Sequence, residues 1–240
     1  MPAKHNIVLV PGLLCDKLLW QPQVSALADI ARCWIADPAR SSTMPGVAAD
    51  VLRDAPFDHF ALAGLSMGGY VALEIVRQAR QRVERLALLD TSARADTPEQ
   101  TRKREEFISL AEHGRFLGVT DALLPLLLHK TRLDEQELVT TVKKMAKNTG
   151  KEAFIREERA ITTRIDSLPL LPSITCPTLV LCGRQDVLTP LDRHEEIAMA
   201  IPGSRLEIIE DCGHLSTLER PEQVSTALRR WLTESPQVRG

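Results

Sequence analysis

Six short apolar runs, each of strand length, set the strongest limit on how this 240-residue chain can fold. Within each run, apolar residues follow one another rather than alternate with polar ones, which is typical of strands covered on both faces in a mainly parallel sheet. Stretches with helical spacing separate most of the runs, so the pattern predicts an α/β fold, a mainly parallel sheet flanked by helices. The runs are IVLV at 7–10, CWIA at 33–36, FALAG at 60–64, RLALL at 85–89, TLVLCG at 178–183 and LEII at 206–209.

Several of the intervening helices have recognisable starts. Thr43 is placed to cap a helix over 45–54. Thr189 followed by Pro190 puts proline at the first position of a helix that reaches about Ala200. A further helix is expected directly after the glycine-rich run GLSMGG, where apolar residues recur on one helical face.

The alternation of strand and helix is interrupted between the fourth and fifth runs. Residues 92–172 contain no convincing strand but several segments of helical pattern. A chain of 240 residues can bury a large core as one domain that carries an insertion. We therefore expect an α/β core built from residues 1–91 and 173–240, interrupted by a helical segment over 92–172.

Charge and composition limit the kinds of partner that this chain is expected to bind. The formal net charge of −2 provides no broad basic field, so neither nucleic acid nor an anionic membrane is expected as the main partner. The apolar run that ends at Pro11 is too short for a signal-peptide core or a membrane span. Five cysteines without a CxxC pair indicate neither a disulfide framework nor a zinc site. We expect a cytoplasmic protein that acts on a small molecule.

Ser66 lies at the centre of a G-x-S-x-G motif, directly after an apolar strand and directly before a helix. A chain that turns from strand to helix within about two residues leaves no room for side chains two positions to either side, which explains the glycines. Such a turn holds the Ser66 hydroxyl at the carboxyl edge of the sheet, near the positive end of the helix. The alternative is a small serine in a crowded turn, so the interpretation depends on whether a base and an acid are present.

His214 is the candidate base. A serine hydroxyl is a weak nucleophile near neutral pH and needs a group that takes its proton. His214 follows the strand at 206–209 and precedes a helical segment, which places it at the same edge of the sheet as the serine. The other five histidines lie at a terminus, in loops or in charged helical stretches, where surface or structural roles are expected.

Asp186 is the candidate acid that would hold the imidazole in one tautomer. It lies in the loop after the strand at 178–183, again at the carboxyl edge. A turn or capping role is the alternative for this residue. Asp90, which ends the strand at 85–89, is the second candidate acid, and Asp211 fits a turn better than catalysis.

The order Ser66, Asp186, His214, each in a loop that follows a strand, resembles the α/β-hydrolase fold superfamily. Within it, the chain looks most similar to small capped carboxylesterase-like members, such as the bacterial enzymes that cleave pimeloyl-carrier methyl esters. Their helical cap corresponds here to residues 92–172. The resemblance covers nearly the whole chain and is carried by IVLVPGLLCDKLLW, GLSMGGYVALE, PTLVLCGRQDVLTP and EDCGHLSTLERPEQV.

The resemblance also assigns an oxyanion hole, a pair of backbone N–H groups that stabilises the negative oxygen of a tetrahedral intermediate. Its donors would be Met67, directly after the nucleophile, and Leu13, in the loop after the strand at 7–10. The chain departs from many relatives in this loop, because Pro11 precedes Gly12 where they have histidine. The histidine that often braces the loop is therefore absent.

A serine at this position implies acyl transfer, and ester hydrolysis through an acyl-enzyme is the leading interpretation, with no metal or organic cofactor. The leucines between 123 and 128 favour a small or medium apolar acyl group if they line a pocket, although core packing also explains them. Two other functions stay open. One is carbon–carbon hydrolysis or lyase chemistry, which Arg156, Arg159 or Arg164 facing the pocket would favour. The other is ligand binding for signalling on a hydrolase scaffold.

A stripe of lysines raises the question of a carrier-protein partner. Lys143, Lys147 and Lys151 recur every four residues, with Lys144 beside the first, so one helix would present a basic face to an acidic acyl-carrier protein. A solvated face is the simpler interpretation, since residues 92–172 carry 14 Lys or Arg against 13 Asp or Glu.

Overall fold

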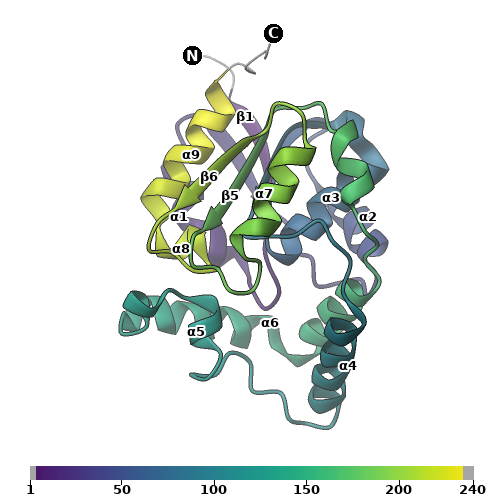
Figure 1. Ribbon diagram of the computed structural model, residues 1–240, viewed down its shortest axis with the longest axis vertical. Coiled ribbons are helices and arrows are strands. Elements are labelled where there is room, and N and C mark those ends of the chain that lie inside the picture. Colours follow the sequence, from purple (N-terminus) through teal and green to yellow (C-terminus); the bar gives the residue numbers. More distant parts are fainter. Residues whose placement is uncertain (1–3, 235–240) are drawn as a thin grey trace.

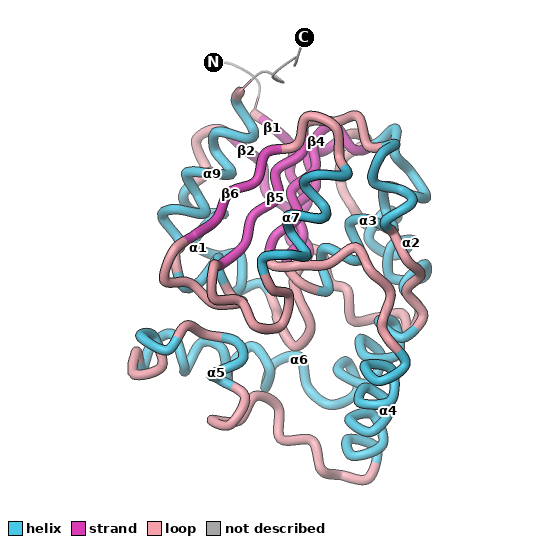
Figure 2. Tube along the Cα trace, in the orientation of Figure 1, coloured by secondary structure: helices cyan, strands magenta, loops and turns pink. Residues whose placement is uncertain are grey.

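The computed structural model describes residues 4–234 and contains one parallel sheet with the strand order β2-β1-β3-β4-β5-β6 (Figures 1 and 2). Each neighbouring pair of strands is parallel. The predicted fold class is confirmed, and each strand overlaps one of the six apolar runs. The strands are β1 (His5–Val10), β2 (Ala31–Ile35), β3 (Phe60–Leu65), β4 (Val83–Leu89), β5 (Thr178–Gly183) and β6 (Arg205–Ile209).

Helices cover both faces of the sheet (Figure 1). On one face lie α1 (Gln21–Ala26) and α9 (Pro221–Thr233), and on the other α2 (Met44–Asp54), α3 (Met67–Ala79) and α7 (Leu191–Ala200). Short helical turns η1 (Lys17–Trp20), η2 (Arg80–Arg82) and α8 (Ser216–Glu219) complete this part of the chain.

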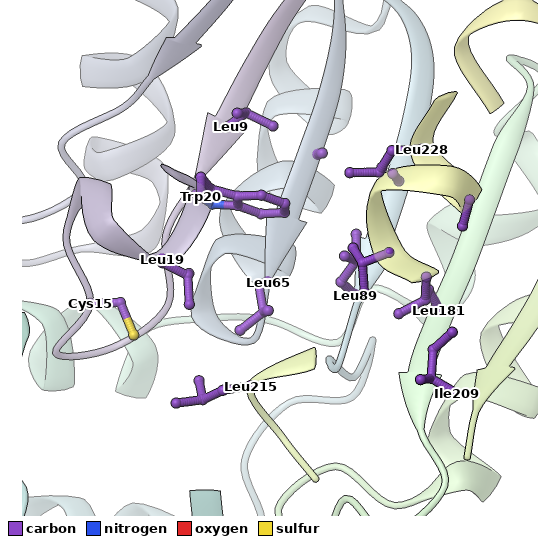
Figure 3. Packing of buried hydrophobic residues seen from close by; sticks show 14 of the residues in the cluster. Leu9, Cys15, Leu19, Trp20, Leu65, Leu89, Leu181, Ile209, Leu215 and Leu228 are labelled. Atoms are coloured by element: carbon purple, nitrogen blue, oxygen red, sulfur yellow. The ribbon is translucent and has the colours of Figure 1, made fainter. Parts of the chain in front are cut away.

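Apolar side chains of successive strand residues enter two separate clusters, one on each face. In β1, Ile7 and Leu9 belong to the cluster beneath α1 and α9, whereas Val8 and Val10 belong to the cluster beneath α2, α3 and α7. Figure 3 shows the first cluster, in which Trp20 lies beside Leu9 and Leu65. Burial on both faces is the reason that the strands appear as continuous apolar runs.

The helix starts agree with the sequence in one case and differ in another. Thr43 caps α2 as predicted, with its hydroxyl accepting the N–H of Gly46 at 3.2 Å. The predicted start of α7 was wrong by one residue, because Pro190 is the N-cap and Leu191 the first helical residue. Thr189 is engaged elsewhere, since its hydroxyl donates to a carboxylate oxygen of Asp186 at 2.6 Å.

Residues 92–172, called the helical segment below, contain no strand among the described residues. They form α4 (Pro98–Glu112), α5 (Leu124–Leu127), η3 (Lys130–Arg132) and α6 (Gln136–Thr162), and their end lies in η4 (Leu168–Ser173). Helices α4, α5 and α6 lie beyond the carboxyl ends of the strands (Figures 1 and 2). Helix α6 is kinked at Gly150, whose φ is 75°. The boundaries of the segment as a separate unit stay a prediction.

No helix within residues 4–234 is long and apolar enough to cross a bilayer. All five cysteines are free thiols. Within the same range, no three His, Cys, Asp or Glu side chains are grouped so that they could hold a metal ion.

Candidate active site

Ser66 sits in a sharp turn between β3 and α3, with φ 57° and ψ −117°. Such a conformation is strained for a residue with a side chain and persists only where the surroundings enforce it. A Cβ atom on Gly64 would lie 2.1 Å from the carbonyl oxygen of Gly68, and one on Gly68 would lie 2.1 Å from that of Val10. Neither position has room for a side chain, which accounts for both glycines of the motif.

The backbone around the serine is also held by the residues that follow β4. The Thr91 hydroxyl donates to the carbonyl of Ser66 at 2.7 Å, and the Thr91 N–H donates to Nε2 of His194 at 2.8 Å. His194 is fully buried, and burial lowers its pKa to about 4. It is therefore neutral at physiological pH and serves as a structural acceptor, in line with the structural role predicted for it.

Ser66, His214 and Asp186 form one chain of hydrogen bonds. His214 Nε2 lies 2.9 Å from Ser66 Oγ, and His214 Nδ1 lies 2.8 Å from Asp186 Oδ2. The histidine and the aspartate are each 3% exposed. In the tautomer with the proton on Nδ1, Nε2 is free to accept the serine proton. The structure thus brings together the three side chains that the sequence places in three separate loops.

Asp186 is ordered by its own loop. Its Oδ1 accepts the N–H groups of Leu188 and Thr189 at 2.9 and 3.0 Å, and its Oδ2 accepts the Thr189 hydroxyl as well as the imidazole. Burial raises the pKa of Asp186, but the charge of His214 and these hydrogen bonds outweigh it, so the pKa lies below its usual value. Burial lowers the pKa of His214, and the charge and hydrogen bond of Asp186 reverse this, so that pKa is raised.

Asp90, the second candidate acid, is fully buried but makes no hydrogen bond to the imidazole. Its Oδ1 accepts the N–H of Gly183 at 2.9 Å, and its Oδ2 accepts the Ser216 hydroxyl. Burial and the charge of Asp186 raise its pKa well above the usual value. Asp90 therefore ties β5 to the start of α8 from behind the site, and Asp186 is the acid that faces the ring.

The histidine loop is tied to the helical segment by contacts that the sequence did not reveal. The buried carboxylate of Glu219 accepts the N–H of Gly213 at 2.9 Å and the N–H of His129 at 2.7 Å. The Leu127 carbonyl accepts the N–H of His214 at 3.1 Å. A glutamate in a charged helical stretch and a backbone carbonyl in a leucine run carry no local signal of such a role.

The two predicted oxyanion donors lie in two backbone segments that both pass next to Ser66. Met67 is the first residue of α3, whose N-terminal N–H groups have no partner inside the helix. The loop that carries Leu13 passes beside the serine, since a Cβ atom on Gly12 would lie 3.3 Å from Ser66 Cβ. Within residues 4–234, neither the Leu13 nor the Met67 N–H donates to a protein acceptor. Their role toward a substrate stays a prediction.

The three arginines considered for an anionic substrate are engaged by protein groups. Arg156 donates to a backbone carbonyl after β2 at 2.6 Å, and Arg159 pairs with Glu112 on the surface at 2.6 Å. The Arg164 guanidinium stacks on Tyr70, with its carbon 3.8 Å from the ring centroid. These contacts do not favour the carbon–carbon hydrolase alternative.

The lysine stripe is partly neutralised. Lys143 pairs with Asp121 at 2.6 Å, and Lys151 lies 3.4 Å from a carboxylate oxygen of Glu152. The face is therefore mixed in charge, which suits a solvated surface better than a basic docking site.

A parallel sheet with a strained serine turn, and with histidine and aspartate in later loops of the same edge, defines an α/β hydrolase. The sequence profile described as "Alpha/beta hydrolase family" matches residues 7–227, and the chain belongs to this family. The family predicted from the sequence is confirmed, and a hydrolase is the class of enzyme that it supports.

Relatives with different named activities are similar to this chain over most of its length. A protein from Yersinia enterocolitica named as a carbamate hydrolase, RutD, is 27% identical and covers 96% of this chain and 88% of its own length. A pimeloyl-[acyl-carrier protein] methyl ester esterase from Nitrosomonas europaea is 24% identical, over 91% of this chain and 92% of its own length.

Two solved structures share the fold over most of this chain. A thermophilic esterase from Thermogutta terrifontis superposes with a TM-score of 0.86 and 31% identity, over 96% of this chain and 90% of its own. An enol-lactonase from Burkholderia xenovorans superposes with a TM-score of 0.84 and 26% identity, over 96% of this chain and 92% of its own.

Proposed function

We propose that this chain is a serine hydrolase that cleaves a carboxylic ester through an acyl-enzyme intermediate. The observation that carries the proposal is the hydrogen-bonded chain from Ser66 through His214 to Asp186, with distances of 2.9 and 2.8 Å. These are the distances at which a base accepts a proton from a nucleophile while an acid orients the base.

In the first half of the reaction, Ser66 Oγ attacks the ester carbonyl carbon while His214 Nε2 takes the hydroxyl proton. The tetrahedral intermediate collapses, the bond to the alcohol oxygen breaks, and the imidazolium gives its proton to the leaving alcohol. In the second half, His214 takes a proton from water, the resulting hydroxide oxygen attacks the acyl-enzyme, and the acid leaves as Ser66 regains its proton. Asp186 stays ionised throughout and stabilises the imidazolium.

Negative charge develops on the carbonyl oxygen in both tetrahedral intermediates. The N–H groups of Leu13 and Met67 are the proposed donors for this oxygen, and one such donor is worth about 3 to 4 kcal/mol in known hydrolases. Met67 also lies at the N-terminus of α3, where the helix dipole favours negative charge. No metal or organic cofactor takes part in these steps.

The helical segment is proposed to act as a cap over this site, with a small or medium apolar acyl group as the substrate moiety. Of its leucine run, Leu124 and Leu128 are buried in the core cluster, whereas Leu123 and Leu126 are exposed. The carbamate, enol-lactone and methyl ester in the names of the relatives all contain an electrophilic carbonyl carbon, the group that the proposed reaction requires. A cytoplasmic location, predicted from the sequence, belongs to this proposal.

Labelling with a fluorophosphonate probe tests the proposal, together with hydrolysis of p-nitrophenyl esters of increasing chain length. We expect the wild type to label and Ser66→Ala not to label, with kcat/KM reduced about 10⁵-fold. Ser109→Ala, on the exposed face of α4, is the matched control and is expected to behave as wild type. A wild-type protein that neither labels nor hydrolyses any ester of the panel contradicts the proposed function.

A further inference from the structure

The loop that carries the proposed oxyanion donor Leu13 has an unfavourable backbone. Its next residue, Leu14, has a φ of 58°, in the left-handed region that residues with a side chain rarely adopt. Nothing within the loop's own sequence favours this conformation at a leucine. The surroundings must therefore hold it.

The group that holds the loop comes from the helical segment. Glu157 of α6 accepts the Leu14 N–H on its Oε2 at 3.1 Å, across 143 residues of sequence. Glu157 is 1% exposed, and its other oxygen, Oε1, is buried without a hydrogen-bond partner among the described residues. The Leu13 and Leu14 side chains also pack against a small apolar cluster from α4 and α6 that includes Phe154.

We propose that Glu157 is a positioning residue for the oxyanion hole, because its carboxyl group fixes the Leu14 N–H and with it the direction of the neighbouring Leu13 N–H. This inference rests on the proposed function and deepens it. Helix α6 of the helical segment would then help to position a backbone donor of the site, in addition to covering the site. A backbone donor contributes to catalysis only if it is already oriented when charge develops on the substrate oxygen.

Glu157 acts in its neutral form. Burial raises the pKa of this carboxyl to about 8, and the nearby acidic groups add to the effect, while the Leu14 N–H and a neighbouring arginine oppose it. Because Oε2 accepts the Leu14 N–H, we assign the proton of the neutral carboxyl to the unpartnered Oε1. The titratable and charged groups that act on Glu157 are Cys15 in the oxyanion loop, Asp37 after β2, and Arg156 and Glu158 on α6.

Ionisation of Glu157 would place a negative charge one residue away from the donor for a negative oxygen. The two charges repel one another in a buried site, so the tetrahedral intermediate becomes less stable when pH rises above the pKa of Glu157. The rate should therefore have an alkaline limb that neither Ser66 nor His214 produces, in addition to the acid limb set by His214.

The pH profile of ester hydrolysis tests this inference in wild type, Glu157→Gln, Glu157→Ala and Glu152→Gln. We expect the wild-type kcat to fall about tenfold as pH rises through about 8. Glutamine keeps the acceptor oxygen and cannot ionise, so Glu157→Gln should lose the alkaline limb and keep the acid limb. Glu157→Ala leaves the Leu14 N–H unpaired, so kcat should fall in the pH range in which wild-type Glu157 is neutral, with less effect on KM. Glu152→Gln, on the exposed side of α6, should retain the wild-type profile.

Two results overturn the inference: an alkaline limb that is absent from the wild type, or one that persists unchanged in Glu157→Gln. Both results are read from wild type and Glu157→Gln, so the test remains valid even if Glu157→Ala fails to fold. The two proposals fail separately. A wild type that labels at Ser66 but gives either of these results leaves the serine hydrolase standing and removes only the role of Glu157.

Discussion

The two sides of the site are held by different kinds of contact. On the serine side, glycines let backbone segments of the core touch one another, as at Gly64 and Gly68. On the other side, buried carboxyl groups connect segments that are far apart in the sequence, since Glu157 bonds to the loop that carries Leu13 and Leu14, and Glu219 joins the histidine loop to residue 129. Contacts within the core therefore position Ser66, whereas the loops that carry Leu14 and His214 are also hydrogen-bonded to the helical segment. Packing of that segment and geometry of the site are coupled.

Apart from the loss of Ser66 itself, the largest expected effect lies entirely within the core. Asp186→Asn should lower kcat about 10⁴-fold, because an amide no longer stabilises the imidazolium and favours the wrong tautomer. The acid limb of the remaining activity should move to lower pH, since the aspartate charge is what raises the pKa of His214. Asp90→Asn is the control and should cost about tenfold or less, because Asp90 makes its hydrogen bonds with Gly183 and Ser216 and not with the imidazole. Equal losses in the two variants would contradict the assignment of Asp186 as the acid.

A smaller but still large effect is expected from a close backbone contact behind the histidine loop. A Cβ atom on Gly183 would lie 2.1 Å from the carbonyl oxygen of Gly213, so Gly183→Ala must displace one of the two loops. We expect the free energy of unfolding, measured with a chemical denaturant, to fall by about 3 kcal/mol. Gly203→Ala is the comparison, with φ 70° but open space around it, and should cost about 1 kcal/mol. Similar losses of stability in the two variants would show that the close contact between Gly183 and Gly213 does not raise the cost of the substitution.

The sequence predicts the core side well because its signals are local. Continuous apolar runs follow from burial on both faces of a parallel sheet, and the G-x-S-x-G spacing follows from one crowded turn. Ser66, Asp186 and His214 could be placed together because parallel strands end at the same edge. Their catalytic roles stay a prediction until activity is measured.

The side that depends on the helical segment could not be predicted in the same way. The absence of a histidine before Gly12 was visible in the sequence, but the contact made by Glu157 was not, since it joins residues 143 positions apart. Glu219 resembles any glutamate of a charged helix. Thr189 illustrates the same limit at short range, because its preference for capping a helix gave way to a hydrogen bond with Asp186.

The smallest expected effect tests whether the helical segment can loosen while the sheet stays intact. Arg104 of α4 pairs with Asp96 at 2.6 Å and with Glu158 of α6 at 2.7 Å, and both carboxylates are nearly buried. Arg104→Met leaves Glu158 without its ion-pair partner, whereas Asp96 keeps an ion pair with Arg164 at 2.7 Å. We expect about 2 kcal/mol less local stability, below the usual cost for fully buried pairs because Arg104 is one-fifth exposed and Asp96 stays paired. Hydrogen exchange should accelerate in α4 and α6.

Amides of β3, β4 and β5 should keep their wild-type exchange in the same protein, since their bonds lie wholly within the core. Arg102→Met, on the exposed face of α4, should change neither region. If the loosened variant labels with fluorophosphonate as fast as wild type but hydrolyses ester more slowly, the core alone presents an active serine and the helical segment aligns the rest. If sheet amides accelerate together with those of α4, the molecule unfolds as one unit and the two sides are not separable.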